Sequence, residues 1–133
     1  MKRFLYAWLL PVVAGLLLAV ALPPFDQSQC GFVALIPLFF AIEGSGRGEA
    51  FRRGYVTGLV FFGLTTWWVV HVSALGAVAL VAFLALYFGV GAWFVSLFGR
   101  NEHDQLGHNL LVMFGGAATW VTLEWIRGHF PLG

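Results

Sequence analysis

Residues 78–98 read VALVAFLALYFGVGAWFVSLF, a run of 21 residues without a charged side chain. An α-helix rises by about 1.5 Å per residue, so a helix of this length crosses the hydrocarbon core of a bilayer, which is about 30 Å thick. The whole chain of 133 residues is 60% hydrophobic and only 10% charged, whereas about a quarter of a soluble domain is charged. The sequence therefore predicts an all-α fold, a polytopic bundle of transmembrane helices.

Further apolar segments on both sides of this run predict about five spans in all. The expected spans are residues 4–22, 31–43, 54–72, 77–98 and 108–126. Because they account for most of the chain, we expect one transmembrane domain over residues 1–133 and no soluble domain.

Two of these spans admit another interpretation. The first has a basic start and ends in Ala-Val-Ala at residues 19–21, which also fits a cleaved signal peptide, but its apolar run is longer than a usual signal core. The second is short and contains Pro37, which is typical of a re-entrant segment. Without a crossing, the arginines at 47–53 would share a side with the charge-poor loop that holds Asp26. The positive-inside rule therefore favours a crossing.

The basic residues also set the orientation of the chain. Those on the side of the N-terminus are Lys2, Arg3, Arg47, Arg52, Arg53 and Arg100. The two opposite loops hold none, so the N-terminus is expected to be cytosolic and Gly133 to lie on the other side. Arg127 is the one exception, and it has Glu124 beside it.

Small residues predict where helices pack closely. Gly54 and Gly58 lie four apart in the third span, a small-xxx-small pattern that lets a neighbouring helix approach. Gly89 and Gly91 give the fourth span a further patch of small residues for close packing. Glu49 precedes two arginines by three and four residues, which is the spacing of ion pairs along a helix.

The last span ends in Trp120-Val-Thr-Leu-Glu124-Trp125-Ile-Arg127-Gly128, where two opposite charges stand at the rim of an apolar run. At helical spacing Trp120, Glu124 and Arg127 share one face, and the two charged residues are close enough to pair. One interpretation is a lining of a substrate path. The other is a structural clamp that holds this helix end to its neighbours, with Trp125 as an interfacial anchor.

Other chemistry-bearing residues favour ordinary roles. Cys30 has no second cysteine for a disulfide and no neighbouring residue that would activate it, and His71 fits an interfacial position. His103 and His108 are five apart, off the spacing of a helical zinc pair, and residues 44–48 lack the lysine of a phosphate-binding loop. No metal or cofactor is therefore expected. Nucleic acid is not expected as a partner either, because the net charge is only +1 and no basic patch is interleaved with aromatic residues.

Three stretches of this chain resemble the start of apolipoprotein N-acyltransferases. They are Pro-Pro-Phe25-Asp26 after the first span, Trp-Trp-Val-Val-His-Val-Ser73 after the third, and Glu124-Trp-Ile-Arg127-Gly128, which is the most specific. The resemblance covers nearly all of this chain but only the first part of such an enzyme, which continues through further spans and a periplasmic nitrilase-like domain. His71 stands where an aromatic residue is common in the family, and His129-Phe-Pro131-Leu132 departs from the usual Gly-Phe-Pro-Trp.

The resemblance implies acyl transfer by the whole enzyme. In the family, a cysteine of the nitrilase-like domain, assisted by a glutamate and a lysine, takes a fatty acyl chain from a phospholipid as a thioester. The α-amine of an apolipoprotein's diacylglyceryl-cysteine then accepts it. None of these catalytic residues falls in this chain, so the segment alone is expected to be inactive. Its implied setting is the bacterial cytoplasmic (inner) membrane, as a multi-pass protein. Its implied partners are phospholipid, the remaining spans, the nitrilase-like domain and, through that domain, the apolipoproteins.

Six residues are expected to line a lipid path or to hold helix ends in place: Glu124, Arg127, Trp120, Trp68, Asp26 and Ser73. The alternative from a different class is a small polytopic scaffold or a component of a transporter. A transporter is expected to show a repeat with broken helices or ionisable groups at mid-span, and neither pattern is visible in the sequence.

Overall fold

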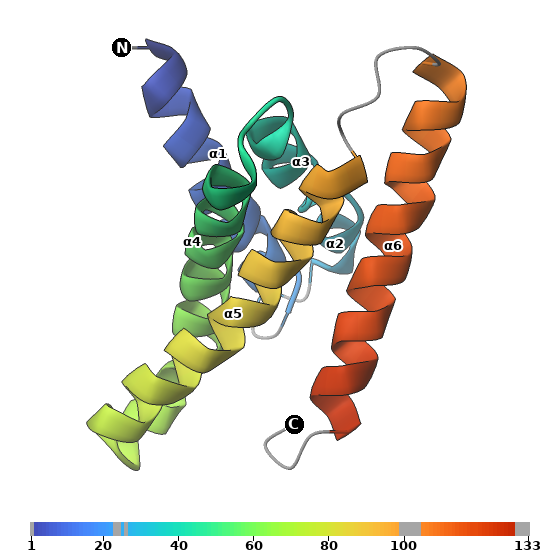
Figure 1. The fold of residues 1–133 in the computed structure, drawn as a ribbon. Coiled ribbons are helices and arrows are strands. Elements are labelled where there is room, and N and C mark those ends of the chain that lie inside the picture. Colours follow the sequence, from blue (N-terminus) through green and yellow to red (C-terminus); the bar gives the residue numbers. More distant parts are fainter. Residues whose placement is uncertain (1, 23–24, 26, 99–104, 130–133) are drawn as a thin grey trace.

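The structure is a computed structural model that describes residues 2–22, 25, 27–98 and 105–129 (Figure 1). Within these residues it is all-helical and holds no strand, which confirms the predicted fold class at that level. The elements are α1 (Lys2–Val20), α2 (Ser28–Val33), α3 (Ile36–Ile42), α4 (Arg47–Thr65), the 3-10 helix η1 (Trp67–His71), α5 (Ala74–Phe98) and α6 (Gln105–His129).

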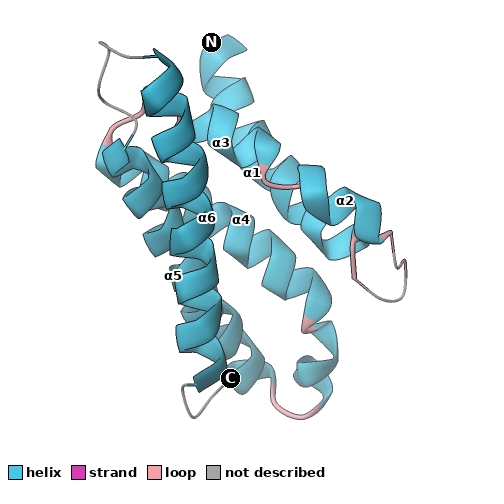
Figure 2. Cartoon of the chain, turned by 90° about the vertical axis from the view of Figure 1, so that its right-hand side faces the viewer, coloured by secondary structure: helices cyan, strands magenta, loops and turns pink. Residues whose placement is uncertain are grey.

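Successive parts of the chain run in alternating directions (Figures 1 and 2). The pair α2 and α3 folds back along α1, α4 then runs away from the end where α1 begins, α5 returns, and α6 runs away again. As a result, the Lys2 end of α1 and the start of α4 lie at one end of the bundle, and η1 and the His129 end of α6 lie at the other. We call these the α4-start end and the η1 end.

The second expected span, residues 31–43, is not one continuous helix in the structure, and whether it crosses a membrane stays a prediction. The structure divides this segment into α2 and α3, with a turn at residues 34–35. Pro37 lies in the first turn of α3, where its missing N–H needs no partner within the helix, so it starts a new helix instead of standing inside one.

The third expected span, residues 54–72, is only partly α-helical. Helix α4 begins at Arg47, ahead of the span, and ends at Thr65, after which residues 67–71 form a 3-10 helix. The hydroxyls of Thr65 and Thr66 donate to the carbonyls of Phe61 and Phe62 at 2.9 and 2.6 Å. Such bonds to the preceding turn, together with β-branching, weaken an α-helix at its end.

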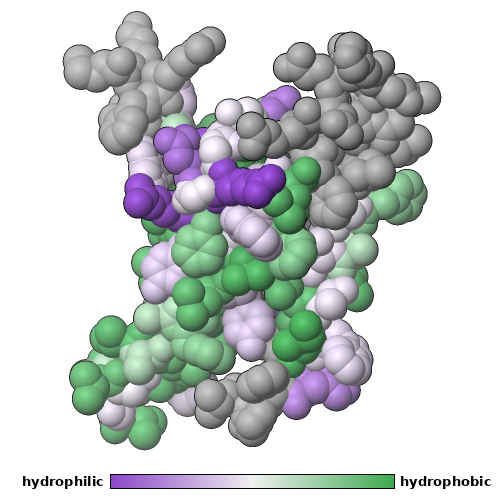
Figure 3. All heavy atoms as spheres, in the orientation of Figure 1, coloured by the Kyte–Doolittle hydropathy of each residue, from purple (hydrophilic) through white to green (hydrophobic). Residues whose placement is uncertain are grey.

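By length and composition, one helical stretch of the described part, Ala74–Leu97, is long and apolar enough to cross a membrane. Tyr6–Val20 and Gln29–Ile42 are apolar but shorter. The predicted count of about five spans therefore stays a prediction. Hydrophobic residues cover much of the visible face of the molecule, and hydrophilic residues gather near the start of α4 (Figure 3).

The predicted close packing at the glycines of α4 is confirmed. A Cβ atom on Gly54 would meet the carbonyl oxygen of Phe88 and stand 2.5 Å from the Cβ of Ala92, and a Cβ on Gly58 would stand 2.8 Å from the Cα of Ala85. Both glycines are buried, so the backbones of α4 and α5 lie against each other with almost no side chain between them. This pair of helices forms the rigid centre of the bundle.

The contact between α1 and α4 is equally close and includes a hydrogen bond. Thr57 is fully buried, and its hydroxyl donates to the carbonyl of Pro11 at 2.9 Å. Beside it, a Cβ on Gly15 would stand 2.8 Å from the carbonyl oxygen of Thr57 and from the Cβ of Val60. A buried hydroxyl is costly unless it is bonded, so this bond fixes the register of α1 on α4.

Candidate functional site

The predicted residues Trp120 and Glu124 lie together in a shallow pocket formed by three helices. The pocket is lined by Phe62 of α4, Tyr87 and Phe88 of α5, and Trp120, Leu123 and Glu124 of α6. Residues four apart on a helix share a face, which is why α6 presents its tryptophan and its carboxylate to the same space.

Aromatic rings form one wall of this pocket. The ring of Trp120 meets Phe88 edge-on, with centroids 4.6 Å apart and an interplanar angle of 80°. Phe88 in turn meets Phe62 edge-on at 5.7 Å. Edge-to-face pairs of this kind are favourable because the positive edge of one ring faces the negative face of the other. The wall is therefore apolar and held by the same α4–α5 contact that buries Gly58.

Glu124 stands at the exposed rim of the pocket, one turn beyond Trp120. The side chain of Arg127 lies outside the described residues, so its predicted ion pair with Glu124 stays a prediction. Trp125, on the other side of α6, is exposed and stacks on His129 with centroids 4.2 Å apart. The helix end thus carries a carboxylate on the pocket side and an aromatic pair on the outer side.

Two further predicted residues, Ser73 and Trp68, do not line the pocket. Ser73 accepts a hydrogen bond from the N–H of Gly76 at 3.1 Å, which is the bond of a helix N-cap, so it starts α5. Trp68 belongs to η1 and is 59% exposed. Asp26 lies outside the described residues.

Four pocket residues were missed by the sequence analysis: Phe62, Tyr87, Phe88 and Leu123. An apolar residue in an apolar helix carries no signal that separates a pocket wall from the rest of the core. The one available clue is the thin patch at Gly54 and Gly58, because a helix that packs on small residues brings its neighbouring aromatic residues to the same contact.

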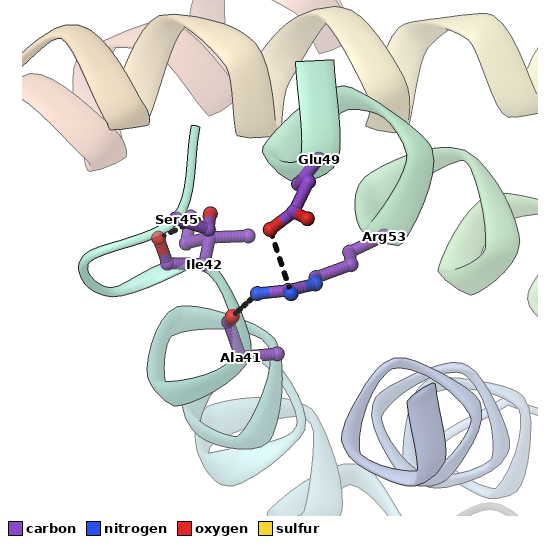
Figure 4. A network of polar contacts seen from close by, with 5 residues as sticks. All are labelled: Ala41, Ile42, Ser45, Glu49 and Arg53. Atoms are coloured by element: carbon purple, nitrogen blue, oxygen red, sulfur yellow. Dashed lines mark hydrogen bonds and ion pairs between the residues drawn. The ribbon is translucent and has the colours of Figure 1, made fainter. Parts of the chain in front are cut away.

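At the α4-start end of the bundle, Arg53 joins α3 to α4 (Figure 4). Its guanidinium donates to the carbonyl of Ala41 and pairs with the carboxylate of Glu49 at 3.0 Å. The hydroxyl of Ser45 donates to the carbonyl of Ile42 at 2.7 Å and closes the last turn of α3. The predicted pairing of Glu49 with an arginine of α4 is confirmed, and the network is a structural clamp between two helices.

The sequence model described as the apolipoprotein N-acyltransferase N-terminal domain matches residues 14–133 of this chain. The chain belongs to this family. An apolipoprotein N-acyltransferase from Geobacter metallireducens is 32% identical over 139 aligned residues, which cover 95% of this chain and 25% of the relative. One from Pseudomonas paraeruginosa is 30% identical, over 94% of this chain and 26% of the relative. One from Pasteurella multocida is 26% identical, over 100% of this chain and 26% of the relative.

The family match confirms the resemblance given by the three sequence stretches. No solved structure gives a significant match to the chain. The chain spans about a quarter of the length of the curated apolipoprotein N-acyltransferases that it matches. Residues 14–133 include all of α4, α5 and α6, so the pocket is built entirely from the part of the chain that the family match covers.

Proposed function

We propose that this chain is the membrane-embedded N-terminal part of an apolipoprotein N-acyltransferase. Such an enzyme would transfer a fatty acyl chain from phospholipid to the N-terminal diacylglyceryl-cysteine of lipoproteins in the bacterial cytoplasmic membrane. The observation that carries the proposal is the family match over residues 14–133. Because the chain corresponds to about a quarter of its relatives, we assign the covalent chemistry to the remaining part and not to Cys30.

The exposed surface supports membrane embedding. Large apolar side chains that are exposed on α1, α3, α5 and α6 include Leu9, Leu16, Phe40, Phe83, Phe94, Phe114 and Val121. Contiguous exposed apolar surface is rare on soluble monomers. In a bilayer these side chains face lipid, and the charges near the start of α4 face water (Figure 3).

Within this proposal, the α4–α5–α6 pocket lies along the path that brings lipid to the catalytic part. Its wall of Phe62, Phe88 and Trp120 is apolar and Glu124 marks the polar rim, but its volume is only about 10 Å³, so an acyl chain would pass along this wall and not lie inside the pocket. We propose that Glu124 pairs with Arg127 or with polar groups of neighbouring helices, because a charge beside hydrocarbon costs free energy unless it is compensated.

Topology is tested with a reporter enzyme that is active only outside the cytoplasm. Fused after Gly133 the reporter should be active, because five expected spans, an odd number, separate Met1 from Gly133. Fused at Gly46, in the turn between α3 and α4, it should be inactive, because two expected spans precede it. Activity at Gly46 with none at Gly133 would overturn the topology and with it the proposed function.

Activity is tested in a chimera in which residues 1–133 replace the matching quarter of the Geobacter metallireducens relative. In cells depleted of their own enzyme, the chimera should N-acylate an apolipoprotein, and mass spectrometry should find no thioester on Cys30. A chimera that reaches the membrane in normal amount but acylates nothing would contradict the proposal and favour a membrane scaffold.

The same chimera separates a lipid path from a clamp at Glu124 and Arg127. The variants are Glu124→Gln, Arg127→Gln and the double variant. Removal of one partner leaves the other charge uncompensated. If the pair is a clamp, each single variant should therefore lose more of its abundance in the membrane than the double variant does. Normal abundance with lost acylation supports the lipid path. Lost abundance that the double variant restores supports the clamp, and full activity in all three would exclude a role for the pair.

A further inference from the structure

Helices α5 and α6 pack side by side and run in opposite directions (Figure 1). Helix α5 runs from the η1 end to the α4-start end, and α6 runs back. A Cβ on Gly116 of α6 would stand 3.6 Å from the side chain of Val95 of α5, so these two residues are opposite each other. Glu124 lies eight residues after Gly116, and Tyr87 lies eight residues before Val95. Equal steps along antiparallel helices therefore place Tyr87 level with Glu124.

A second contact between the two helices agrees with this alignment. A Cβ on Gly91 would stand 3.1 Å from the side chain of Leu123. Gly91 lies about one helical turn after Tyr87 on α5, and Leu123 directly precedes Glu124 on α6. Tyr87 and Glu124 also line the same pocket. The two side chains therefore border one small space between α5 and α6.

Three of the residues that line the pocket carry a polar side-chain group, and the other three are hydrocarbon. The polar groups are the hydroxyl of Tyr87, the indole N–H of Trp120 and the carboxylate of Glu124. Across the described residues, neither the Tyr87 hydroxyl nor the Trp120 indole N–H is hydrogen-bonded to another protein group. By contrast, the hydroxyl of Ser96, also in α5, donates to the carbonyl of Trp93 at 2.6 Å. Tyr87 and Trp120 can therefore each bind a partner in the pocket.

The pocket has room for a single water molecule. Its volume is about 10 Å³, which is close to the smallest space that holds one water, and such a water makes about two to four hydrogen bonds. An indole N–H only donates, an ionised carboxylate only accepts, and a tyrosine hydroxyl does both. One water can therefore accept from Trp120, donate to Glu124 and form a third bond with Tyr87.

We propose that Tyr87 positions Glu124 by sharing one bound water with it in this pocket. Tyr87 is a positioning residue: its hydroxyl holds the water, and the water holds one carboxylate oxygen. A carboxylate has about four acceptor sites, so this bond leaves room for a pair with Arg127. The consequence for lipid rests on the proposed function, in which a carboxylate held from α5 keeps the polar rim in place beside the apolar wall.

A double-mutant cycle in the intact chain tests the link between the two residues. Tyr87→Phe removes the hydroxyl, Glu124→Met removes the acceptor, and the equilibrium constant of unfolding is measured in mixed micelles. With Glu124 present, Tyr87→Phe should raise this constant by about 3- to 10-fold, the usual effect of one lost hydrogen bond. In the Glu124→Met background the same change should raise it by less than about twofold, the usual error of additivity.

Tyr55→Phe is the matched control for the loss of a tyrosine hydroxyl. Tyr55 belongs to α4, stacks on Phe51 with centroids 6.2 Å apart and does not line the pocket. Its replacement should change the unfolding constant by the same factor with Glu124 and in the Glu124→Met background. Equal effects of Tyr87→Phe in the two backgrounds would overturn the inference, because the hydroxyl would then act independently of the carboxylate.

The water itself is tested by a crystal structure of the chain in a lipid mesophase, at a resolution that shows ordered waters. We expect one water within about 3.2 Å of both the Tyr87 hydroxyl oxygen and a carboxylate oxygen of Glu124. A direct bond between the two side chains without a water would overturn the inference, and so would a carboxylate that points away from Tyr87.

The chimera with the Geobacter metallireducens relative separates this inference from the proposed function. In an active chimera, Tyr87→Phe should lower N-acylation per molecule in the membrane, and Tyr55→Phe should not. Full acylation by the Tyr87→Phe chimera would contradict the positioning role. A parent chimera that acylates nothing would refute the proposed function alone, since the unfolding cycle and the crystal structure decide the water site without any activity.

Discussion

Replacement of Gly54 by alanine tests the closest helix contact in the structure. A Cβ at this position would meet the carbonyl oxygen of Phe88 and lie 2.5 Å from the Cβ of Ala92. Neither neighbour is the flexible end of a long side chain, so relief requires α4 and α5 to move apart. Because this contact lies at the centre of the bundle, the movement loosens the packing on both sides of it.

Two opposing contributions determine how Gly54→Ala changes the free energy of unfolding. Overpacking of a close contact costs about 1–3 kcal/mol, whereas alanine is a better helix former than glycine by up to about 1 kcal/mol. Gly63→Ala, also in α4, is the matched control, since a Cβ there meets nothing within 4 Å. Both variants gain helix propensity, so the difference between them isolates packing, and Gly54→Ala should be less stable than Gly63→Ala by about 1–3 kcal/mol.

The measurement is the free energy of unfolding in mixed micelles, followed by circular dichroism as a denaturing detergent is added. Leucine at the two positions extends the series, because its larger side chain should widen the difference. Equal stability of Gly54→Ala and Gly63→Ala would refute the reasoning, since it would mean that α4 and α5 are not in backbone contact at this point.

Three further predictions use the same unfolding measurement. Thr57→Val keeps the shape of the side chain but removes its bond to Pro11 and should cost about 0.5–1.5 kcal/mol, and unchanged stability would contradict the proposed register of α1 on α4. Arg53→Met should cost more than Glu49→Gln, because the arginine side chain is 13% exposed and holds α3 whereas the carboxylate is 61% exposed. Equal costs would show that the surface pair matters more than the bond to α3. Ser73→Ala should cost about 0.5–2 kcal/mol by removing the cap of α5, and Ser73→Asp should restore most of it if capping is the cause.

The parts of the fold that the sequence predicted correctly depend on spacing along one helix. Glu49 and Arg53 were expected to pair because residues four apart are neighbours on a helix, and they do. Gly54 and Gly58 were expected to admit a neighbouring helix for the same reason, and α5 lies against both. Predictions from spacing along one helix do not require knowing which helix is the partner.

The break in residues 31–43 and the end of α4 were not predicted, because each depends on competition between similar local free energies. Pro37 is compatible with a kink inside a helix and with the first turn of a new one, and only the packing of α2 and α3 on α1 decides between them. Thr65 and Thr66 likewise allow an α-helix, and their hydroxyl bonds to the preceding turn favour its end only in context.

The same distinction applies to the candidate site: residues on one helix could be predicted together, and residues contributed by other helices could not. Trp120 and Glu124 were placed on one face by spacing alone, and both line the pocket. The opposite wall comes from Phe62 and Phe88, about 60 and 30 residues earlier in the sequence, and no local pattern connects them with α6. Ser73 was predicted as a site residue from resemblance, and its observed bond gives it a structural role as a helix cap.

The shape of the pocket depends on how α6 is held. Its wall from α4 and α5 is rigid, because these helices meet at glycines with little room to shift. Helix α6 packs on α5 through Trp120 and Leu123, and its opposite side exposes Val121 and Trp125. The rim that carries Glu124 is thus joined to the wall by the pair of Trp120 with Phe88 and by Leu123 beside Gly91. A change in the position of α6 therefore alters the pocket without disturbing the α4–α5 core, so in the proposed enzyme the segments that pack on the exposed side of α6 would set the opening of the lipid path.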